Sequence, residues 1–110
     1  MRAILAATNY TGLAENAVKY AAGIARQNNY KLILLNDFTI SVHVENARSA
    51  GWVDELINEN KILLESKALL LADEYGIEVF AKATFSFIDN AIKKLVAEYQ
   101  PELIVMGMEE

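Results

Sequence analysis

The polar residues that follow short apolar runs in this sequence have the side chains best suited to binding a ligand. Thr8 and Asn9 come directly after an apolar run that ends at Ala7, and Asn36 and Asp37 end a second run. Hydroxyl and amide groups can hydrogen-bond a sugar or a base, and a carboxylate can also hold a cation. We therefore treat Ala7, Thr8, Asn9, Asn36 and Asp37 as part of a candidate ligand-binding crevice.

A third apolar run, near the end of the sequence, closes with Met106 and Gly107, which we add to the same candidate set. Asp37 and Glu109 could together bind a cation, but carboxylates after strand ends are common solvated loop residues. We predict no metal site. His43, the one histidine, lies in a stretch without periodicity, and we predict that it is a surface residue rather than a general base.

Motifs of known catalytic loops are missing from the sequence. It has no Gly-x-Ser-x-Gly elbow, no Walker-type Gly-rich lysine loop, no Gly-x-Gly-x-x-Gly and no cysteine. We therefore predict that the protein is not an enzyme.

The composition sets broad limits on the function. The 110 residues predict one domain, 1–110, and 54% of them are apolar, enough for a core. The formal charge of -5 argues against binding to nucleic acid or anionic lipid, both of which favour basic surfaces. The apolar runs are far shorter than the roughly 20 residues of a membrane span. We expect a cytoplasmic protein.

Alternating apolar runs and helical patterns predict the elements that must position the candidate residues. The predicted strands cover Ala3–Ala7, Lys31–Asn36, Ile77–Ala83 and Glu102–Gly107. Apolar residues at helical spacing predict helices from Leu13 to about Gln27, from Trp52 to Tyr75, and from Ser86 to just before Pro101. Asp37 to Gly51 is interpreted as a loop.

This alternation predicts an open, doubly wound α/β sheet of parallel strands in three α/β/α layers, flavodoxin-like or Rossmann-like, with the strand order 3-2-1-4. Ligands of such sheets bind beyond the carboxyl ends of the strands where the chain reverses direction, here between the first and fourth strands. The candidate residues all fall at strand ends of this kind.

Smaller features leave alternatives open. Ser86 and Asp89 have the spacing of a capping box at the start of the last helix. Among Phe80, Phe85 and Phe87 we expect at least two to pack into the core, although they could form an interaction patch. Trp52 could belong to a partner surface or fix the start of the long helix.

Three segments together resemble the universal stress protein family. They are Ile4-Leu5-Ala6-Ala7-Thr8-Asn9-Tyr10-Thr11, Lys31-Leu32-Ile33-Leu34-Leu35 and Pro101-Glu102-Leu103-Ile104-Val105-Met106-Gly107. The resemblance covers essentially the whole sequence and implies the fold above, similar to adenine nucleotide alpha hydrolase-like proteins. It also implies a cytoplasmic stress-response role, frequent dimers and, in one branch, binding of adenine nucleotides.

Departures from the family pattern argue against a nucleotide cofactor. Asn9 stands where members usually have aspartate, and Asp37 places an acid where they offer apolar backbone to the adenine. Nucleotide-binding members continue after the glycine with Gly-x-x-Gly-x9-Gly-Ser/Thr, whereas Gly107 precedes Met108-Glu109-Glu110. We expect nucleotide binding to be weak or lost; the alternative is an ATP or AMP binder whose phosphate loop lies beyond residue 110.

The resemblance also implies a fourth helix and a fifth strand that this sequence does not show. A strand such as Leu103 to Met106 left at the sheet edge would expose unpaired backbone groups. We expect either that the domain is C-terminally incomplete or that a partner covers this edge, and we predict a homodimer or a protein partner.

Overall fold

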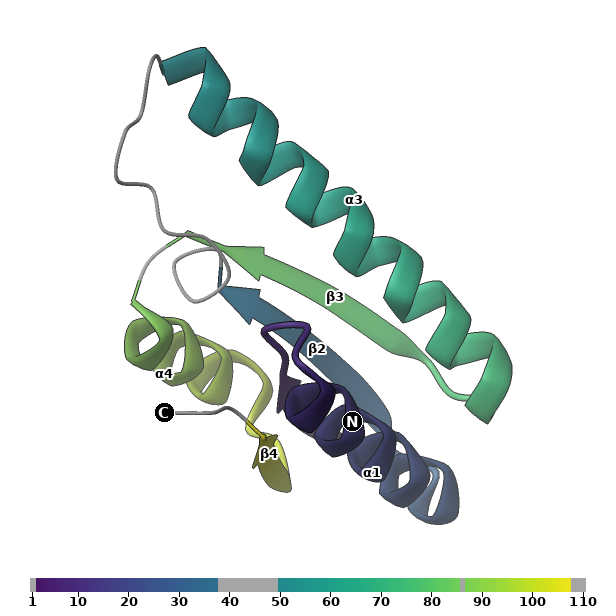
Figure 1. Ribbon diagram of the computed structural model, residues 1–110. Coiled ribbons are helices and arrows are strands. Elements are labelled where there is room, and N and C mark those ends of the chain that lie inside the picture. Colours follow the sequence, from purple (N-terminus) through teal and green to yellow (C-terminus); the bar gives the residue numbers. More distant parts are fainter. Residues whose placement is uncertain (1, 38–49, 86, 108–110) are drawn as a thin grey trace.

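A four-stranded parallel sheet forms the centre of the domain (Figure 1). The computed structural model describes residues 2–37, 50–85 and 87–107, and the side chains of 50–53 are not described. The elements follow in the order β1 (Ala3–Ala7), α1 (Gly12–Asn28), β2 (Lys31–Asp37), α3 (Ala50–Tyr75), β3 (Val79–Thr84), α4 (Ile88–Tyr99) and β4 (Leu103–Met106). The strand order is β3-β2-β1-β4, which confirms the predicted fold class and topology.

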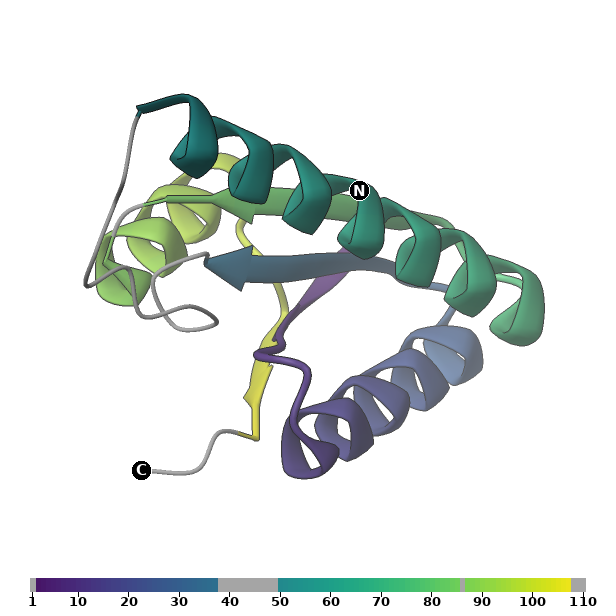
Figure 2. The same cartoon turned by 45° about the horizontal axis from the view of Figure 1, so that its top comes forward.

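Helices cover both faces of the sheet, as Figures 1 and 2 show. One face packs residues such as Ile4 and Leu34 against α1 and α3, and the other packs Leu5 and Ile33 against α4. The central strands β1 and β2 are buried on both faces because each has helices above and below it. This burial explains why their sequences are apolar without alternation.

Local signals in the sequence set most of the helix ends. Thr11 is the N-cap of α1, and its hydroxyl accepts a hydrogen bond from the Ala14 amide at 3.3 Å. Asn29 ends α1 in the left-handed conformation, and Gly76, with φ of 65°, follows the end of α3. Gln100, with φ of 47°, ends α4 just before Pro101.

Of two predictions near the start of α4, one lies outside the described residues and the other is wrong. The helix begins at Ile88 with Phe87 as its N-cap, and the predicted capping box depends on Ser86, which the structure does not describe. Phe85 and Phe87 are 48% and 74% exposed, so only Phe80 of the three phenylalanines packs against the core. The two residues lie between the carboxyl end of β3 and the start of α4.

Other boundaries differ by one or two residues. The long helix begins at Ala50 rather than Trp52, β3 covers Val79–Thr84, and β4 is shorter than predicted. His43 and most of the predicted loop after β2 lie outside the described residues, as does the side chain of Trp52.

Candidate functional site

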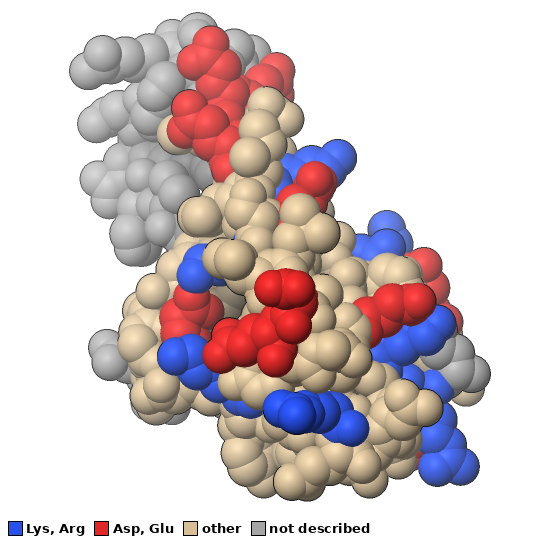
Figure 3. Space-filling view, turned by 90° about the vertical axis from the view of Figure 1, so that its right-hand side faces the viewer, with Lys and Arg blue, Asp and Glu red and all other residues tan. Residues whose placement is uncertain are grey.

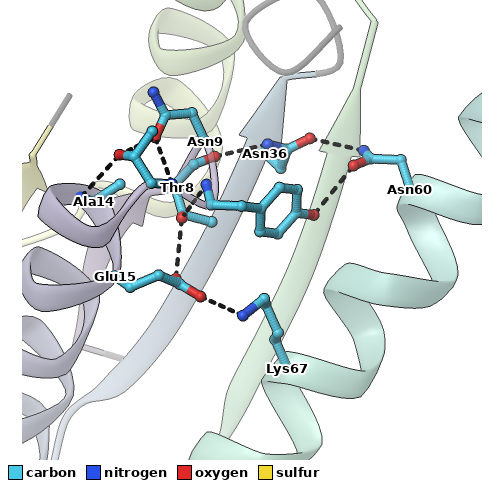
Figure 4. A network of polar contacts seen from close by, with 9 residues as sticks. Thr8, Asn9, Ala14, Glu15, Asn36, Asn60 and Lys67 are labelled. Atoms are coloured by element: carbon cyan, nitrogen blue, oxygen red, sulfur yellow. Dashed lines mark hydrogen bonds and ion pairs between the residues drawn. The ribbon is translucent and has the colours of Figure 1, made fainter. Parts of the chain in front are cut away.

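The carboxyl ends of β1 and β2 are joined by hydrogen bonds from the candidate residues themselves (Figure 4). The Thr8 backbone amide donates to the Leu35 carbonyl at 2.8 Å, and the Asn36 side-chain amide donates to the Thr8 carbonyl at 2.7 Å. Thr8 and Asn36 are both fully buried. These bonds satisfy buried polar groups and extend the contact between the two strands beyond the sheet.

Asn36 also connects the sheet to α3. Its Oδ1 accepts a hydrogen bond of 2.7 Å from Nδ2 of Asn60, and Oδ1 of Asn60 accepts one of 3.1 Å from the Tyr10 hydroxyl. Asn60 is only 9% exposed. An amide can donate and accept at once, which makes asparagine suited to a buried link between three elements.

Asn9 folds back on the turn that precedes α1. Its Oδ1 accepts from the Thr11 backbone amide at 3.2 Å and from the Thr11 hydroxyl at 2.7 Å. This Asx turn orients the N-cap residue. Within the part of the chain that the structure describes, Nδ2 of Asn9 makes no hydrogen bond.

An ion pair connects the start of α1 to α3. Oε1 of Glu15 contacts Nζ of Lys67, and Oε2 of Glu15 accepts a hydrogen bond of 3.1 Å from the Thr8 hydroxyl. The same hydroxyl accepts from the Tyr10 backbone amide at 3.0 Å. The Thr8 hydroxyl therefore has both a donor and an acceptor partner inside the fold.

Tyr10 is the residue of this loop with an unusual backbone. Its φ of 66° is uncommon for a side chain of this size. Burial first, and then the charge of Glu15, raise the pKa of Tyr10 to about 12 because both disfavour the phenolate. The Lys67 ammonium lies 5.5 Å from the centre of its ring. The loop conformation is thus held by contacts with α3.

The remaining candidate residues lie along the same edge of the sheet. Asp37 is buried and accepts a hydrogen bond of 2.8 Å from the Thr84 hydroxyl of β3. Ala7 is buried and pairs with Met106 of β4, whose side chain is 41% exposed.

Gly107, the last candidate residue, sits tightly against the first turns of α1. A Cβ atom at this position would lie 2.6 Å from the Leu13 carbonyl oxygen and 2.8 Å from the Ala17 Cβ. The glycine is therefore required by the close approach of two chain segments.

The structure places the candidate residues at neighbouring strand ends, but sequence reasoning missed the residues that connect them to the surrounding elements. Four residues outside the candidate set, Tyr10, Glu15, Asn60 and Thr84, hydrogen-bond candidate residues directly, and Lys67 contacts Glu15. Asn60 had a readable signal, because it precedes Leu64 and Ala68 at four-residue spacing on the buried side of the helix. No comparable signal marks the other four.

Among the residues whose placement is described, no group of three or more histidine, cysteine, aspartate or glutamate side chains could hold a metal ion. Among the same residues no helix is both long enough and apolar enough to cross a membrane.

The outer edge of β4 is a second surface of functional interest. β4 is the last strand of the sheet, so one side of its backbone has no neighbouring strand among the described residues. Ile104 and Met106, in register with Leu5 and Ala7, face the side covered by α4, and Leu103, in register with Ile4, faces the side of α1. All three are between 41% and 43% exposed. We call Leu103, Ile104 and Met106 the β4 edge.

Comparison with known proteins assigns the family. The sequence profile described as the universal stress protein family matches residues 1–110. The chain belongs to the universal stress protein family. No match was found among curated proteins.

Solved structures of universal stress proteins share the fold. A member from Burkholderia pseudomallei is 19% identical with a TM-score of 0.75, over 96% of this chain and 80% of that one. The universal stress protein UspA from Lactobacillus plantarum is 15% identical with a TM-score of 0.71, over 99% and 80%. A universal stress protein in complex with cAMP is 21% identical with a TM-score of 0.69, over 96% and 75%.

Proposed function

We propose that this universal stress protein domain is a non-enzymatic, cytoplasmic stress-response module that works by association, with itself or with a protein partner, through the β4 edge. The observation that carries the proposal is the open outer side of β4, which presents three exposed apolar side chains on the two faces of one short strand. A strand of this composition favours pairing with another strand, because its backbone groups and its apolar side chains are then removed from water together.

The chemistry of the strand ends supports binding to protein rather than to nucleotide. The Thr8 hydroxyl and the Asn36 amide both take part in hydrogen bonds inside the fold. A ligand that used these atoms would have to replace those bonds, which offsets much of the gain. Asn9 carries no charge toward a metal-bound phosphate. We therefore propose that nucleotide binding is weak or lost and that no cofactor is needed.

A second candidate function is binding of an adenine nucleotide, either ATP or AMP, with a phosphate loop supplied beyond residue 110. The solved universal stress protein that holds cAMP favours this candidate, as does the amide nitrogen of Asn9, which has no partner among the described residues. An amide donor of this kind suits a ribose hydroxyl or a purine nitrogen.

Light scattering of wild-type and variant proteins tests the association. We expect the wild-type mass to rise from monomer to dimer with concentration, and Ile104→Lys to remain a monomer because a lysine at an edge strand opposes pairing. The matched control is Tyr20→Lys, at a position on α1 that is 65% exposed, and it should dimerise normally. A wild-type monomer at every concentration would exclude self-association. Association with a different protein would then remain, and a pull-down compared between wild type and Ile104→Lys would test it.

Calorimetry on the 110-residue chain, and on a chain that includes any segment after residue 110, separates the two candidate functions. Titration with ATP and Mg²⁺, and separately with AMP and cAMP, should give no heat of binding at ligand concentrations up to about 1 mM. A dissociation constant in the micromolar range for any of them would contradict the weak-binding proposal.

A further inference from the structure

The long helix α3 carries apolar side chains on the side that faces away from the sheet. Ile62, Leu63, Leu69 and Leu70 are 57%, 46%, 73% and 69% exposed. The buried side of the same helix is formed by Asn60, Leu64 and Ala68. A surface helix normally has a polar outer side, so an apolar one suggests a contact that the domain alone does not provide.

These exposed residues lie on one face of the helix. They are three or four residues before and after Ser66, and side chains at that spacing are neighbours on a helix. Ser66 lies at the centre of the face, and its hydroxyl donates to the Ile62 carbonyl at 3.0 Å. Because the serine side chain is small and its hydroxyl already has a hydrogen-bond partner, another chain can approach the helix closely at this point.

The charged side chains on this face are acidic. Glu59 and Asp73 lie seven residues before and after Ser66, two helical turns away, and Glu55 lies one turn before Glu59. All three are exposed. Figure 3 shows acidic side chains at the top of the view, at the height where Figure 1 places the first half of α3. The nearest lysine along the face, Lys67, is paired with Glu15.

The charges decide against a second copy of the same helix. Two α3 helices paired antiparallel about Ser66 would bring Glu59 of one copy opposite Asp73 of the other, twice, by symmetry. Like charges placed opposite one another oppose association. A partner with basic residues around an apolar stripe would instead complement both the carboxylates and the leucines.

We propose that the outer face of α3, formed by Glu59, Ile62, Leu63, Leu69, Leu70 and Asp73, is a docking site for a basic amphipathic helix of another protein. Apolar residues of that helix, repeated at i, i+3, i+4 and i+7, pack against the four aliphatic side chains. Its lysines or arginines flank this stripe and meet the acidic residues, which fixes the position of the helix and speeds association.

Fluorescence anisotropy with designed peptides tests the site. The probe is a labelled helix of about four turns with a leucine stripe flanked by lysines. Two matched peptides replace every lysine by glutamate or scramble the order of the same residues. We expect the leucine-lysine helix to bind with a dissociation constant of about 1–100 µM, more weakly at higher salt, and we expect neither matched peptide to bind.

Variants of the full chain locate the binding. Leu69→Gln combined with Leu70→Gln changes only exposed side chains and should weaken binding at least tenfold, and Glu59→Lys should weaken it by a smaller factor. Ile104→Lys should bind the peptide as wild type does, so failure of the β4 proposal and failure of this one are distinguishable. No binding up to about 1 mM, equal binding of the scrambled peptide, or equal binding by the double variant would overturn the proposal. A double variant that stops dimerising would also overturn it, in favour of a second copy.

Discussion

Asn60 of α3 donates its side-chain amide to Oδ1 of Asn36, at a distance of 2.7 Å, and so connects the long helix to the carboxyl end of β2. The same asparagine accepts a hydrogen bond from the Tyr10 hydroxyl of the loop after β1. One buried side chain thus positions two strand ends that sequence reasoning assigned to a ligand crevice. These strand ends have a structural role whether or not a ligand binds there.

Removing Asn60 should destabilise the fold. Asn60→Ala leaves the Asn36 Oδ1 and the Tyr10 hydroxyl each without the partner it has now, and a buried polar group without a partner costs about 1–3 kcal/mol. We expect the free energy of unfolding in urea to fall by that amount. The control is Asn58→Ala, at an exposed position of the same helix, which should change stability by less than about 0.5 kcal/mol. Equal effects of the two substitutions would contradict the role assigned to Asn60.

Stability should depend on Tyr10 at alkaline pH. Its pKa is raised from 10.0 to about 12 in the folded protein, so the unfolded chain loses the proton first as the pH rises. The stabilising contribution is complete below pH 10 and is lost between pH 10 and about 12. Urea unfolding of wild type and Tyr10→Phe across this range should show the steeper loss in wild type. Parallel curves would show that Tyr10 titrates as an ordinary tyrosine.

Gly107 and Gly23 should respond to alanine in opposite directions. Gly107→Ala places a Cβ 2.6 Å from the Leu13 carbonyl oxygen. We expect the free energy of unfolding to fall by about 1–3 kcal/mol, because β4 and α1 must move apart. Gly23 lies inside α1 with no atom within 4 Å of an added Cβ, so Gly23→Ala should stabilise by about 0.5–1 kcal/mol. Thermal unfolding of both variants measures the two signs, and a neutral Gly107→Ala would refute the close contact.

The central strand β2 and the edge strand β4 should differ in how much stability they lose when a large side chain is replaced by alanine. Ile33 of β2 is fully buried between helices, and Ile33→Ala should cost about 2–5 kcal/mol by lost burial and cavity formation. Ile104 of β4 is 43% exposed, so Ile104→Ala should cost less than half as much when the protein is a monomer. Chemical denaturation at low protein concentration makes the comparison. A cost at Ile104 equal to that at Ile33 would mean that the β4 edge is covered.

The apolar runs made the fold readable from the sequence. Ala3–Ala7 and the run before Asn36 are buried on both faces, and two-sided burial leaves an unbroken apolar pattern. A buried helix can have the same pattern, and the polar turn residues that follow Ala7 favoured a strand. Thr11 and Gly76 marked helix ends because their side chains, or the lack of one, favour those backbone conformations. The prediction that at least two of the three phenylalanines pack into the core failed at Phe85 and Phe87, because size and apolarity alone do not place a residue in the core.

The connections of the candidate site were not readable in the same way. Glu15 and Lys67 are 52 positions apart and meet only because α1 and α3 cover the same face of the sheet. Charged residues at helical spacing are far more often solvated than paired across helices, so sequence alone could not single them out. The outer face of α3 could not be predicted from the sequence either. Apolar residues occur on both sides of this helix, so the sequence pattern did not show which of them are exposed.

Hydrogen–deuterium exchange at β4, followed as a function of protein concentration, tests the central claim most directly. If the β4 edge pairs with another copy, the outward-facing amides between Leu103 and Met106 should exchange more slowly as the concentration rises, and Ile104→Lys should abolish this protection. Amides of the buried strand β2 should exchange at the same rate at every concentration and serve as the internal reference. Exchange at β4 that stays fast and independent of concentration in the wild-type protein would contradict self-association through this edge.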